Sequence, residues 1–414
     1  TLHWFSTIIV QSNAEMEKEE YMDFDIDLIY LWCDGNDPEF IMEKNKYITG
    51  KESNYGVQEQ RFFENDELRY SIRSAMMYIP WIRNIFIVTN NQIPRWIDAN
   101  NPRIRIVNQS DIIDDELNPV FNSAAIEFNF YKIKDLSEHF IYANDDMFVG
   151  KSLEKSFFFD METGFPNIDV LSSINCIKDI LIKNNFSMIL KSNEYKNSDL
   201  YRKREILMNK FTYEVFKDKD LIGFSTSHQF QAYLKSALKE DVTMPPFNKI
   251  FKLGLKERFR GKNFVPRIMI DLIEGNKKRA NLITRDRGIM YYTKLDYLSV
   301  FFDKPTLFCI NELDNSKKSE LESILEQRFL NQRFNRANQF EILPPDYRIT
   351  SKITDLRRDK MISAEILKWL LLMSFNLSVI IFSVSFGRNY SRKIREILTL
   401  IEDGRPINQE DCSG

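Results

Sequence analysis

Two acidic turns, each directly after a run of apolar residues, are the parts of this sequence best suited to chemistry. Asn144-Asp145-Asp146 follows the run from Phe140 to Ala143, and Asp34-Gly35-Asn36-Asp37 follows the run from Ile26 to Trp32. Carboxylates after a buried strand can hold a divalent cation such as Mg²⁺ or Mn²⁺, which prefers oxygen ligands and can bridge a nucleotide diphosphate. A solvated turn or a helix cap is the competing interpretation of Asn144-Asp145-Asp146, and an Asx turn between strand and loop is that of Asp34-Gly35-Asn36-Asp37. Their coincidence favours a shared site.

Other side chains could take part in proton or phosphate chemistry. Glu127 lies in an otherwise apolar predicted helix, so it is either on an exposed stripe, which the sequence favours, or buried and suited to proton transfer. His228 follows Ser225-Thr226-Ser227 at the expected start of a helix, where it could act as a base, contact phosphate or simply lie near a cap. Arg258 and Arg260 could clamp a phosphate or end a helix.

A mostly parallel α/β sheet with helices on its faces is the fold that would bring these groups together. Buried strands are predicted at 26–32, 84–89, 104–107, 140–143 and, later in the chain, 306–310. A helix that Asn65 can cap and Pro80 ends separates the first two strands. Further helices are predicted at 120–133, 227–239, 247–260 and 321–329. Ligands bind at the carboxyl ends of strands in such sheets, which is where both acidic turns lie.

Composition indicates a folded protein in a reducing, cytoplasmic compartment. The 414 residues allow one large domain with insertions or two to three units, and 43% hydrophobic residues argue against a disordered chain. The net charge of −3, from 57 basic and 60 acidic residues, gives no indication of a nucleic-acid partner. The cysteines are Cys33, Cys176, Cys309 and Cys412. They form no CxxC pair, so neither a zinc site nor a disulfide framework is expected.

The chain is expected to divide into a lead-in at 1–23, a catalytic region at 24–316 and a helical C-terminal region at 317–414. Within the catalytic region, 165–220 is a candidate insertion or flap because it is less periodic and partly basic and Asn-rich. The run Phe5 to Val10 is too short for a signal peptide.

The C-terminal region contains a nearly continuous apolar segment from Trp369 to Phe386, followed by several arginines and lysines. Its 18-residue length is at the lower edge of what can span a bilayer, and Asn376 interrupts it. A buried core helix is the favoured interpretation. A membrane-surface segment, which would place the protein on the inner face of the cell membrane, and a true span are the alternatives.

Beyond these local patterns, much of the chain resembles the Stealth family. Ile26 to Pro38 resembles the first signature block of that family. The second block is longer and highly specific, and its matches are Arg61-Phe62, Asn65 to Ser74, Pro80 to Asn90, Gln92 to Trp96, Phe121 to Glu127 and Leu136 to Asp146. Ser227-His228-Gln229 and Arg258-Phe259-Arg260 resemble a looser third block, and Phe308 to Glu312 resembles a short fourth block. The first two blocks lie within 24–164 and the last two within 221–316.

The resemblance implies a nucleotide-sugar-transferase-like fold and a sugar-1-phosphate transferase. The family includes bacterial capsule polymerases and the animal lysosomal GlcNAc-1-phosphotransferase. The implied reaction transfers a hexose or N-acetylhexosamine 1-phosphate from a UDP-sugar to a hydroxyl of an oligosaccharide or polysaccharide acceptor, and releases UMP. Attack at the β-phosphorus builds charge on phosphoryl oxygens, which arginine or a metal ion can neutralise. A role in capsule synthesis also implies contact with capsule-assembly proteins.

Carried over residue by residue, the resemblance implies a catalytic set of Glu127, Asp146, His228 and an arginine. Arg260 fits the motif better and Arg258 fits the spacing better, so both remain candidates. Metal binding is implied for Asp145, Asp146 and Glu312, although Glu312 stands where the family usually has Asp. Substrate binding is implied for Trp32, Asp34, Asp37, Arg69, Arg73 and Asn311.

Two alternatives compete with this interpretation. A metal-dependent glycosyltransferase would share the acidic turn and the sheet but would release UDP instead of UMP. A membrane-associated assembly subunit without enzymatic activity would use 369–386 as an anchor and would turn over no UDP-sugar. The donor sugar, the acceptor and the oligomeric state are not encoded in any pattern of the sequence.

Overall fold

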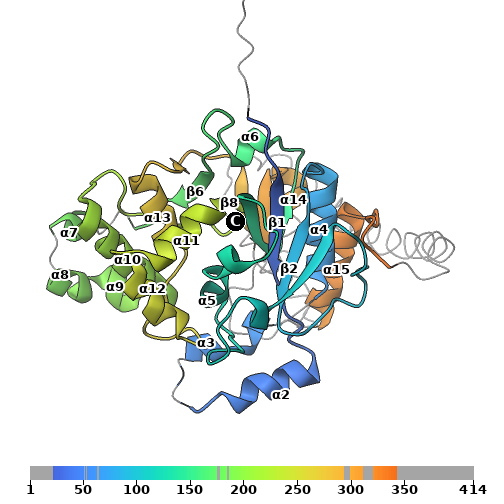
Figure 1. The fold of residues 1–414 in the computed structure, drawn as a ribbon, viewed down its shortest axis with the longest axis horizontal. Helices are drawn as coiled ribbons and strands as arrows, with labels where there is room; N and C mark the ends of the chain where they lie inside the picture. The colour runs from blue at the N-terminus through green and yellow to red at the C-terminus, as the bar shows by residue number, and fades with distance from the viewer. Residues whose placement is uncertain are drawn as a thin grey trace, which may run out of the picture. The chain divides into compact units, whose positions relative to one another are not determined.

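A mixed sheet of five strands lies at the centre of the computed structural model, which describes residues 22–50, 52, 54–62, 65–174, 178–183, 186–292, 299–310 and 320–342. The strand order is β3-β2-β1-β4-β8 (Figure 1). Their bounds are β1 Ile26–Leu31, β2 Ile85–Thr89, β3 Ile104–Asn108, β4 His139–Asn144 and β8 Gln231–Leu234. All neighbours are parallel except β8, which runs antiparallel to β4. The predicted α/β class with a mostly parallel sheet is therefore confirmed.

The structure also contains two three-stranded sheets, separate from the five-stranded sheet. One has the order β10-β11-β5, with bounds β5 Met147–Val149, β10 Ile289–Tyr292 and β11 Leu307–Ile310. The other has the order β7-β6-β9, with bounds β6 Asn167–Leu171, β7 Ser225–Thr226 and β9 Asn281–Ile283. β5 follows β4 after a two-residue turn and pairs antiparallel with β11. The predicted strand at 306–310 is thus confirmed, and it lies against the second acidic turn.

Strands β1, β2 and β4 are apolar on both faces because helices cover both faces of the sheet. Ile29 of β1 and Tyr142 of β4 pack into one core cluster, whereas Leu28 and Ile141 pack into another. The first face is covered by α5 Ser123–Glu127, α10 Leu200–Phe216, α11 Lys235–Thr243, α12 Asn248–Leu255 and α13 Ile268–Asn276. The second is covered by α4 Glu67–Tyr78. Burial on both faces explains why these strands read as continuous apolar runs.

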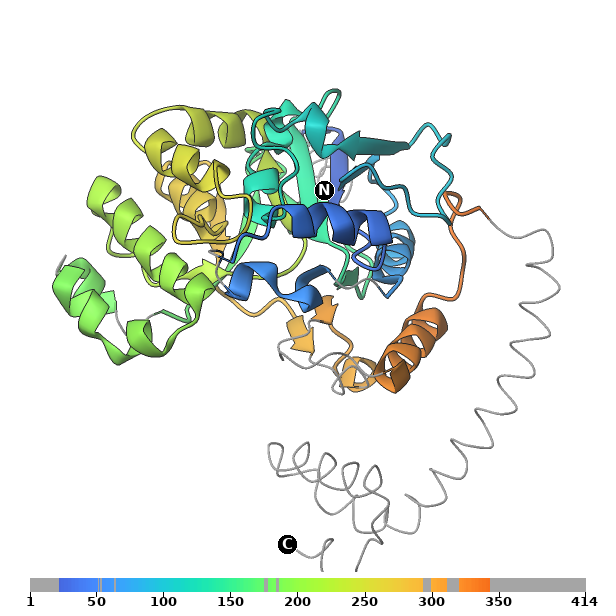
Figure 2. The ribbon, with the colours of Figure 1, turned by 90° about the horizontal axis from the view of Figure 1, so that it is seen from below.

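The remaining helices are peripheral or short. They are α2 Pro38–Lys46, α3 Asn54–Val57, α6 Lys155–Phe158, α7 Lys178–Ile182, α8 Phe186–Lys191, α9 Asn193–Asn197, α14 Val300–Asp303 and α15 Glu320–Arg333, with 3-10 turns at Glu59–Phe62, Gln109–Asp111 and Phe130–Lys132. Figure 2 shows α7 to α10, in green, gathered beside the yellow helices α11 to α13. The region at 165–220, predicted as an insertion or flap, therefore consists largely of helices, and Met208 of α10 is fully buried in the core.

Three predicted helices have other bounds in the structure. The helix expected at 120–133 is two short pieces, α5 and the 3-10 turn at Phe130–Lys132. The helix expected at 227–239 begins at Lys235, because β7 and β8 occupy the preceding residues and β8 pairs with β4. The helix expected at 247–260 ends at Leu255. His228, Arg258 and Arg260 therefore all lie on loops, not on helices.

The compact unit extends through Ile342, beyond the residue 316 at which the catalytic region was expected to end. Phe329 and Leu330 of α15 pack against Phe148 and Phe308 in one core cluster. Among the described residues, no helix is long and apolar enough to cross a membrane. Trp369 to Phe386 lies outside the described residues.

Asp27 ties together the entrances of three neighbouring strands. Its fully buried carboxylate accepts hydrogen bonds from the Arg83 guanidinium at 2.9 and 2.6 Å, from the Asn84 backbone at 3.1 Å and from the Ser137 backbone at 2.8 Å. Buried backbone N–H groups require such partners, so this one side chain sets how β1, β2 and β4 begin.

Replacement of Asp27 by Ala should lower the free energy of unfolding by about 3 kcal/mol, because it leaves two backbone donors without their acceptor and removes the buried carboxylate that Arg83 binds. Urea unfolding followed by circular dichroism measures this loss. Asp25→Ala is the matched control, since Asp25 pairs with the same arginine but its side chain is 67% exposed. Equal stability of the Asp27→Ala protein and the control would contradict this account of the sheet.

Candidate active site

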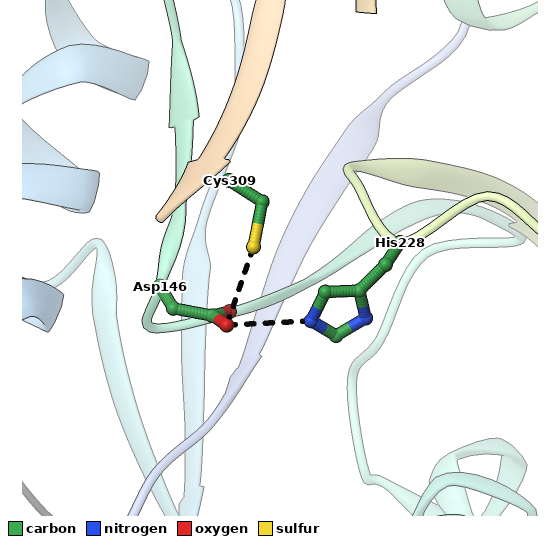
Figure 3. A group of neighbouring side chains, drawn as sticks. All are labelled: Asp146, His228 and Cys309. Carbon is green, nitrogen blue, oxygen red and sulfur yellow. Dashed lines mark hydrogen bonds and ion pairs between the residues drawn. The ribbon is translucent and has the colours of Figure 1, made fainter. Parts of the chain in front are cut away.

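Asp146 lies in the turn between β4 and β5, at the carboxyl edge of the central sheet. Its Oδ2 atom is 3.3 Å from Nε2 of His228 and accepts a hydrogen bond from the Cys309 thiol at 3.3 Å (Figure 3). Its backbone oxygen accepts from the Ile310 N–H at 3.0 Å, so the turn is also held by β11. Asp146 and His228, two members of the implied catalytic set, therefore lie in contact, although 82 residues separate them in the sequence.

The loop that carries His228 is anchored by a buried polar network. Gln229 donates to Asp169 Oδ2 at 3.0 Å, and Gln231 donates to the Asp169 backbone oxygen at 2.8 Å. Asp169 in turn forms a two-pronged ion pair with Arg287, whose Nε lies 2.8 Å from Oδ1. Asp169 and Arg287 are both largely buried, so the network is shielded from water. It joins the His228 loop to β6 and to the segment that leads into β10.

Tyr291 of β10 supports the same loop from its other side. Its hydroxyl accepts the backbone N–H of His228 at 2.5 Å and lies 2.8 Å from the Ser227 hydroxyl. Burial raises the pKa of Tyr291 to about 12, so this hydroxyl keeps its proton at neutral pH. His228 is thus positioned through its backbone, and its ring remains one-third exposed.

Glu127 is half-buried at the end of α5, whereas the sequence favoured an exposed stripe. Tyr142 explains the difference, because its hydroxyl donates to Glu127 Oε1 at 3.0 Å and also lies 2.5 Å from Oδ1 of Asn144. Burial raises the pKa of Tyr142 well above its usual value, so the hydroxyl acts as a donor. Tyr142 therefore links Glu127 to the residue that precedes the acidic pair.

The two candidate arginines point to different surroundings. Arg260 donates to the Ser123 hydroxyl at 2.6 Å, on the helix that carries Glu127, and its charge is felt at Tyr142. The guanidinium of Arg258 instead lies 4.0 Å from the centre of the Tyr47 ring, with a long contact of 3.5 Å to the Glu116 backbone oxygen. Arg260, not Arg258, is thus the arginine beside the Glu127 cluster.

A third arginine, Arg267, lies deeper in the same cluster. It is 8% exposed, and its Nε and Nη1 atoms are buried without a hydrogen-bond partner. Its guanidinium lies 5.0 Å from the centre of the Tyr142 ring, and the carboxylates of Glu127 and Asp271 are its electrostatic neighbours. Burial raises the pKa of Asp271 to about 7, while Arg267 acts in the opposite direction. This buried charge balances the carboxylates behind the site.

The first acidic turn is held at the neighbouring strand ends by Gln92. Gln92 accepts from the Asp34 N–H at 3.0 Å and donates to the Asp34 backbone oxygen at 3.0 Å and to Asp37 Oδ2 at 3.1 Å. The Gln92 hydrogen bond lowers the pKa of Asp37, which also caps α2 through the Glu39 N–H. A Cβ at Gly35 would lie 1.6 Å from the Phe62 backbone oxygen, so only glycine fits this turn.

The other predicted substrate-binding residues are dispersed. Trp32 is 6% exposed and follows β1. Arg69 pairs with Asp66 at 3.0 Å and stacks over Trp96. Arg73 is 4% exposed and forms an ion pair with Glu341 at 2.7 Å, which gives it a role in joining α4 to the end of the compact unit. Asn311 and Glu312 lie outside the described residues.

The donor atoms at Asp146 suit a divalent cation. Asp146 Oδ1 is buried and has no hydrogen-bond partner, and an orphaned carboxylate oxygen is a natural ligand for such an ion. Asp145 adds a second carboxylate in the same turn. Asp146, His228 and Cys309 each offer one ligand atom, and these three atoms lie within 4.8 Å of one another.

Sequence reasoning missed the residues that act through long-range contacts. Tyr142 lies inside a predicted strand, where its ring suggested only packing. Cys309 lies in a predicted strand too, and its distance from other cysteines argued against metal binding. Nothing in the local pattern around Arg267, Asp169 or Arg287 distinguishes them from ordinary surface residues. For Tyr142 there was a partial signal, because side chains alternate along a strand and Tyr142 therefore lies on the opposite face from Ala143.

Comparison with known proteins supports the similarity noted from the motifs. Residues 61–166 match conserved region 2 of the Stealth proteins. A capsular polysaccharide phosphotransferase of Haemophilus influenzae is 33% identical over 325 residues, which cover 74% of this chain and 84% of that protein. One from Actinobacillus suis is 40% identical over 148 residues, covering 35% of this chain and 40% of the relative. An exopolysaccharide phosphotransferase of Streptomyces coelicolor is 39% identical over 137 residues, covering 33% of this chain and 23% of the relative.

Solved structures of transferases are similar to this chain only at low TM-scores and low identity. The galactosyltransferase LgtC, in complex with donor and acceptor sugar analogues, covers 78% of this chain and 99% of its own, with 11% identity and a TM-score of 0.37. Mouse xyloside xylosyltransferase 1 covers 70% of this chain and 98% of its own, with 12% identity and a TM-score of 0.33.

Replacement of Asp169 by Ala should lower the free energy of unfolding by about 3–5 kcal/mol, because it leaves the buried Arg287 charge without its partner. Chemical unfolding of the purified variant measures this loss. Asp114→Ala is the control, since the Asp114 side chain is 77% exposed in its pair with Lys132 and should change stability by less than about 1 kcal/mol. A variant at Asp169 that is as stable as the control would argue against an anchoring role.

Proposed function

This chain belongs to the Stealth family of capsular polysaccharide phosphotransferases, and we propose that it transfers a sugar 1-phosphate from a UDP-sugar to a hydroxyl of a growing cell-surface polysaccharide. The observation that carries the proposal is the meeting of Asp146 with His228, next to a second cluster formed by Glu127, Tyr142 and Arg260. Carboxylate, imidazole and guanidinium groups together can serve a displacement at phosphorus.

The proposed reaction is a single displacement at the β-phosphorus. The acceptor hydroxyl forms a new O–P bond, and the bond between the β-phosphorus and the bridging oxygen of the diphosphate breaks. UMP leaves with that oxygen, and the hydroxyl proton passes to a base on the enzyme. The sugar keeps its bond to the phosphate oxygen, so its anomeric configuration is unchanged.

Each side chain then has a role suited to its surroundings. His228 lies beside the transferred phosphate, oriented by Asp146 and by the contact of its backbone with Tyr291. Glu127, held by Tyr142, is a second group able to accept a proton. Arg260 neutralises charge that develops on the phosphoryl oxygens. Asp34 and Asp37, at the end of the neighbouring strand, contribute to donor binding.

A divalent cation, Mg²⁺ or Mn²⁺, would be held by Asp145 and by the free oxygen of Asp146. When bound, it would supply positive charge to the diphosphate and make UMP a better leaving group. The donor class places the reaction in the cytoplasm, and polysaccharide assembly implies contact with capsule-assembly proteins at the inner face of the membrane.

The proposal predicts one UMP released for each phosphodiester formed. The protein is incubated with Mg²⁺ or Mn²⁺, a panel of UDP-sugars and oligosaccharide primers; chromatography follows the nucleotide, and ³¹P nuclear magnetic resonance follows the product. Asp146→Asn should lower kcat by about 10³-fold, because a neutral amide cannot replace the carboxylate charge.

Asp114→Asn serves as the control for the loss of one carboxylate, because Asp114 is exposed and pairs only with Lys132 among the contacts described. If UDP is the sole nucleotide product, the reaction is glycosyl transfer, and the proposal of phosphotransfer is wrong. No turnover of any UDP-sugar would favour the assembly-subunit alternative.

The two candidate arginines can be separated by mutation. Arg260→Ala should lower kcat/KM by about 100-fold, because it removes a positive charge held at Ser123, on the helix that carries Glu127. Arg258→Ala should change it by less than about fivefold, because the contacts of that guanidinium in the described part of the chain are with Tyr47 and the Glu116 backbone, not with the helix that carries Glu127. Steady-state kinetics with the active donor measures both values, and the reverse order would overturn the assignment of Arg260.

A further inference from the structure

Three different ligand atoms converge at the second acidic turn. Asp146 Oδ2 is 3.3 Å from His228 Nε2 and 3.3 Å from Cys309 Sγ, and all three ligand atoms lie within 4.8 Å of one another. Around a tetrahedral Zn²⁺ ion, with bonds of about 2.0 Å to nitrogen or oxygen and about 2.3 Å to sulfur, neighbouring ligand atoms lie about 3.3–3.6 Å apart. Two of the three separations thus already match those around a bound ion.

The chemical types of these ligands select the ion. Mg²⁺ binds hard oxygen ligands and takes no thiolate, whereas Zn²⁺ and Co²⁺ bind a mixed set of nitrogen, oxygen and sulfur. We propose that Asp146, His228 and Cys309 form a site for a borderline metal ion such as Zn²⁺, and that its occupation inhibits the transferase. The inhibition rests on the proposed function, because a bound ion would occupy Asp146 and His228, which that function needs. The binding of the ion does not depend on the proposed function.

The ligands are carried by elements whose backbones are already fixed. Cys309 lies in β11, directly opposite Met147 of β5, so its position relative to Asp146 is set by strand pairing. The His228 backbone is held by Tyr291. A site on rigid elements needs little reorganisation to bind a metal ion.

The Asp146 carboxylate also has an unused oxygen that a cation can take, the same one that the proposed function assigns to Mg²⁺ or Mn²⁺. Asp146 Oδ1 is buried without a hydrogen-bond partner, although its twin Oδ2 has two. The side chains of Asp146 and His228 are 23% and 33% exposed, so an ion can enter from their side, while Cys309 forms the closed inner wall. Binding converts the thiol to a thiolate and releases its proton to solvent, and no oxidant or reductant takes part.

The metal site is tested on the full chain, stripped of metal by a chelator and titrated with Co²⁺. A near-ultraviolet sulfur-to-cobalt charge-transfer band should appear in the wild type and in Cys33→Ser, the matched control, and should be absent from Cys309→Ser. Cys309→Ser should also weaken Zn²⁺ binding by at least about 100-fold. Loss of a residue that only supports a metal ligand, without binding the ion itself, weakens binding by less. A wild type without the band, or a Cys309→Ser protein that keeps it, would overturn the site.

A measurement on the wild type alone covers the case in which the Cys309 variants fail to fold. X-ray absorption at the zinc edge should show one sulfur at about 2.3 Å together with nitrogen or oxygen ligands. A shell containing only nitrogen and oxygen would overturn the assignment of Cys309.

Inhibition is measured as UMP release with excess Mg²⁺ and increasing Zn²⁺, with each protein compared to its own rate without zinc. The concentration of Zn²⁺ that halves the rate should rise by at least about 100-fold in Cys309→Ser, in parallel with the loss of binding. Equal inhibition of wild type and variant would overturn the inhibitory role. If no UMP is released at all, the proposed function fails, whereas the cobalt and zinc spectra still decide whether the site exists.

Discussion

The Asp146 carboxylate joins three segments that are distant in the sequence, and the candidate site depends on this junction. Its contacts reach His228 across 82 residues and Cys309 across 163. The parallel pairing of β1 with β4 brings the two acidic turns to one edge of the sheet, the pairing of β5 with β11 brings Cys309, and the pairing of β4 with β8 brings the His228 loop. Each pairing is needed, because a loop alone has no means of fixing a side chain to within a hydrogen bond.

Buried polar groups make this junction rigid. Asp27 organises the strand entrances, and Asp169 with Arg287 anchors the loop that leads to His228. Arg267 supplies charge behind Tyr142 and Glu127. Such groups are costly to bury unless they are paired, since the protein interior solvates charge poorly. Asp169, Arg287 and Arg267 therefore fix side chains at the candidate site, whereas Asp27 fixes the opposite, amino-terminal edge of the sheet.

The parts of the fold that follow from local pattern were predictable. The strands at Ile26, Ile85 and His139 are apolar on both faces, and α4 has a clear buried stripe, so each was evident from periodicity. The segment around His228 was not, because Gln229 and Gln231 read as helical residues while their amides are bound by Asp169 on another strand. Tertiary hydrogen bonds overrode the local preference there.

By itself, the sequence determined the strand that presents Asp146, the acidic turns and the α/β class, because these depend on side-chain alternation and turn chemistry within a few residues. Its motifs also indicated Glu127, His228 and an arginine as a set. Only the tertiary structure decided that Arg260 donates to Ser123 on the helix that carries Glu127, that Arg73 is bound to Glu341, and that Cys309 touches Asp146. Those contacts join residues more than a hundred positions apart, and the chain brings them together through strand pairing and core packing that no local pattern records.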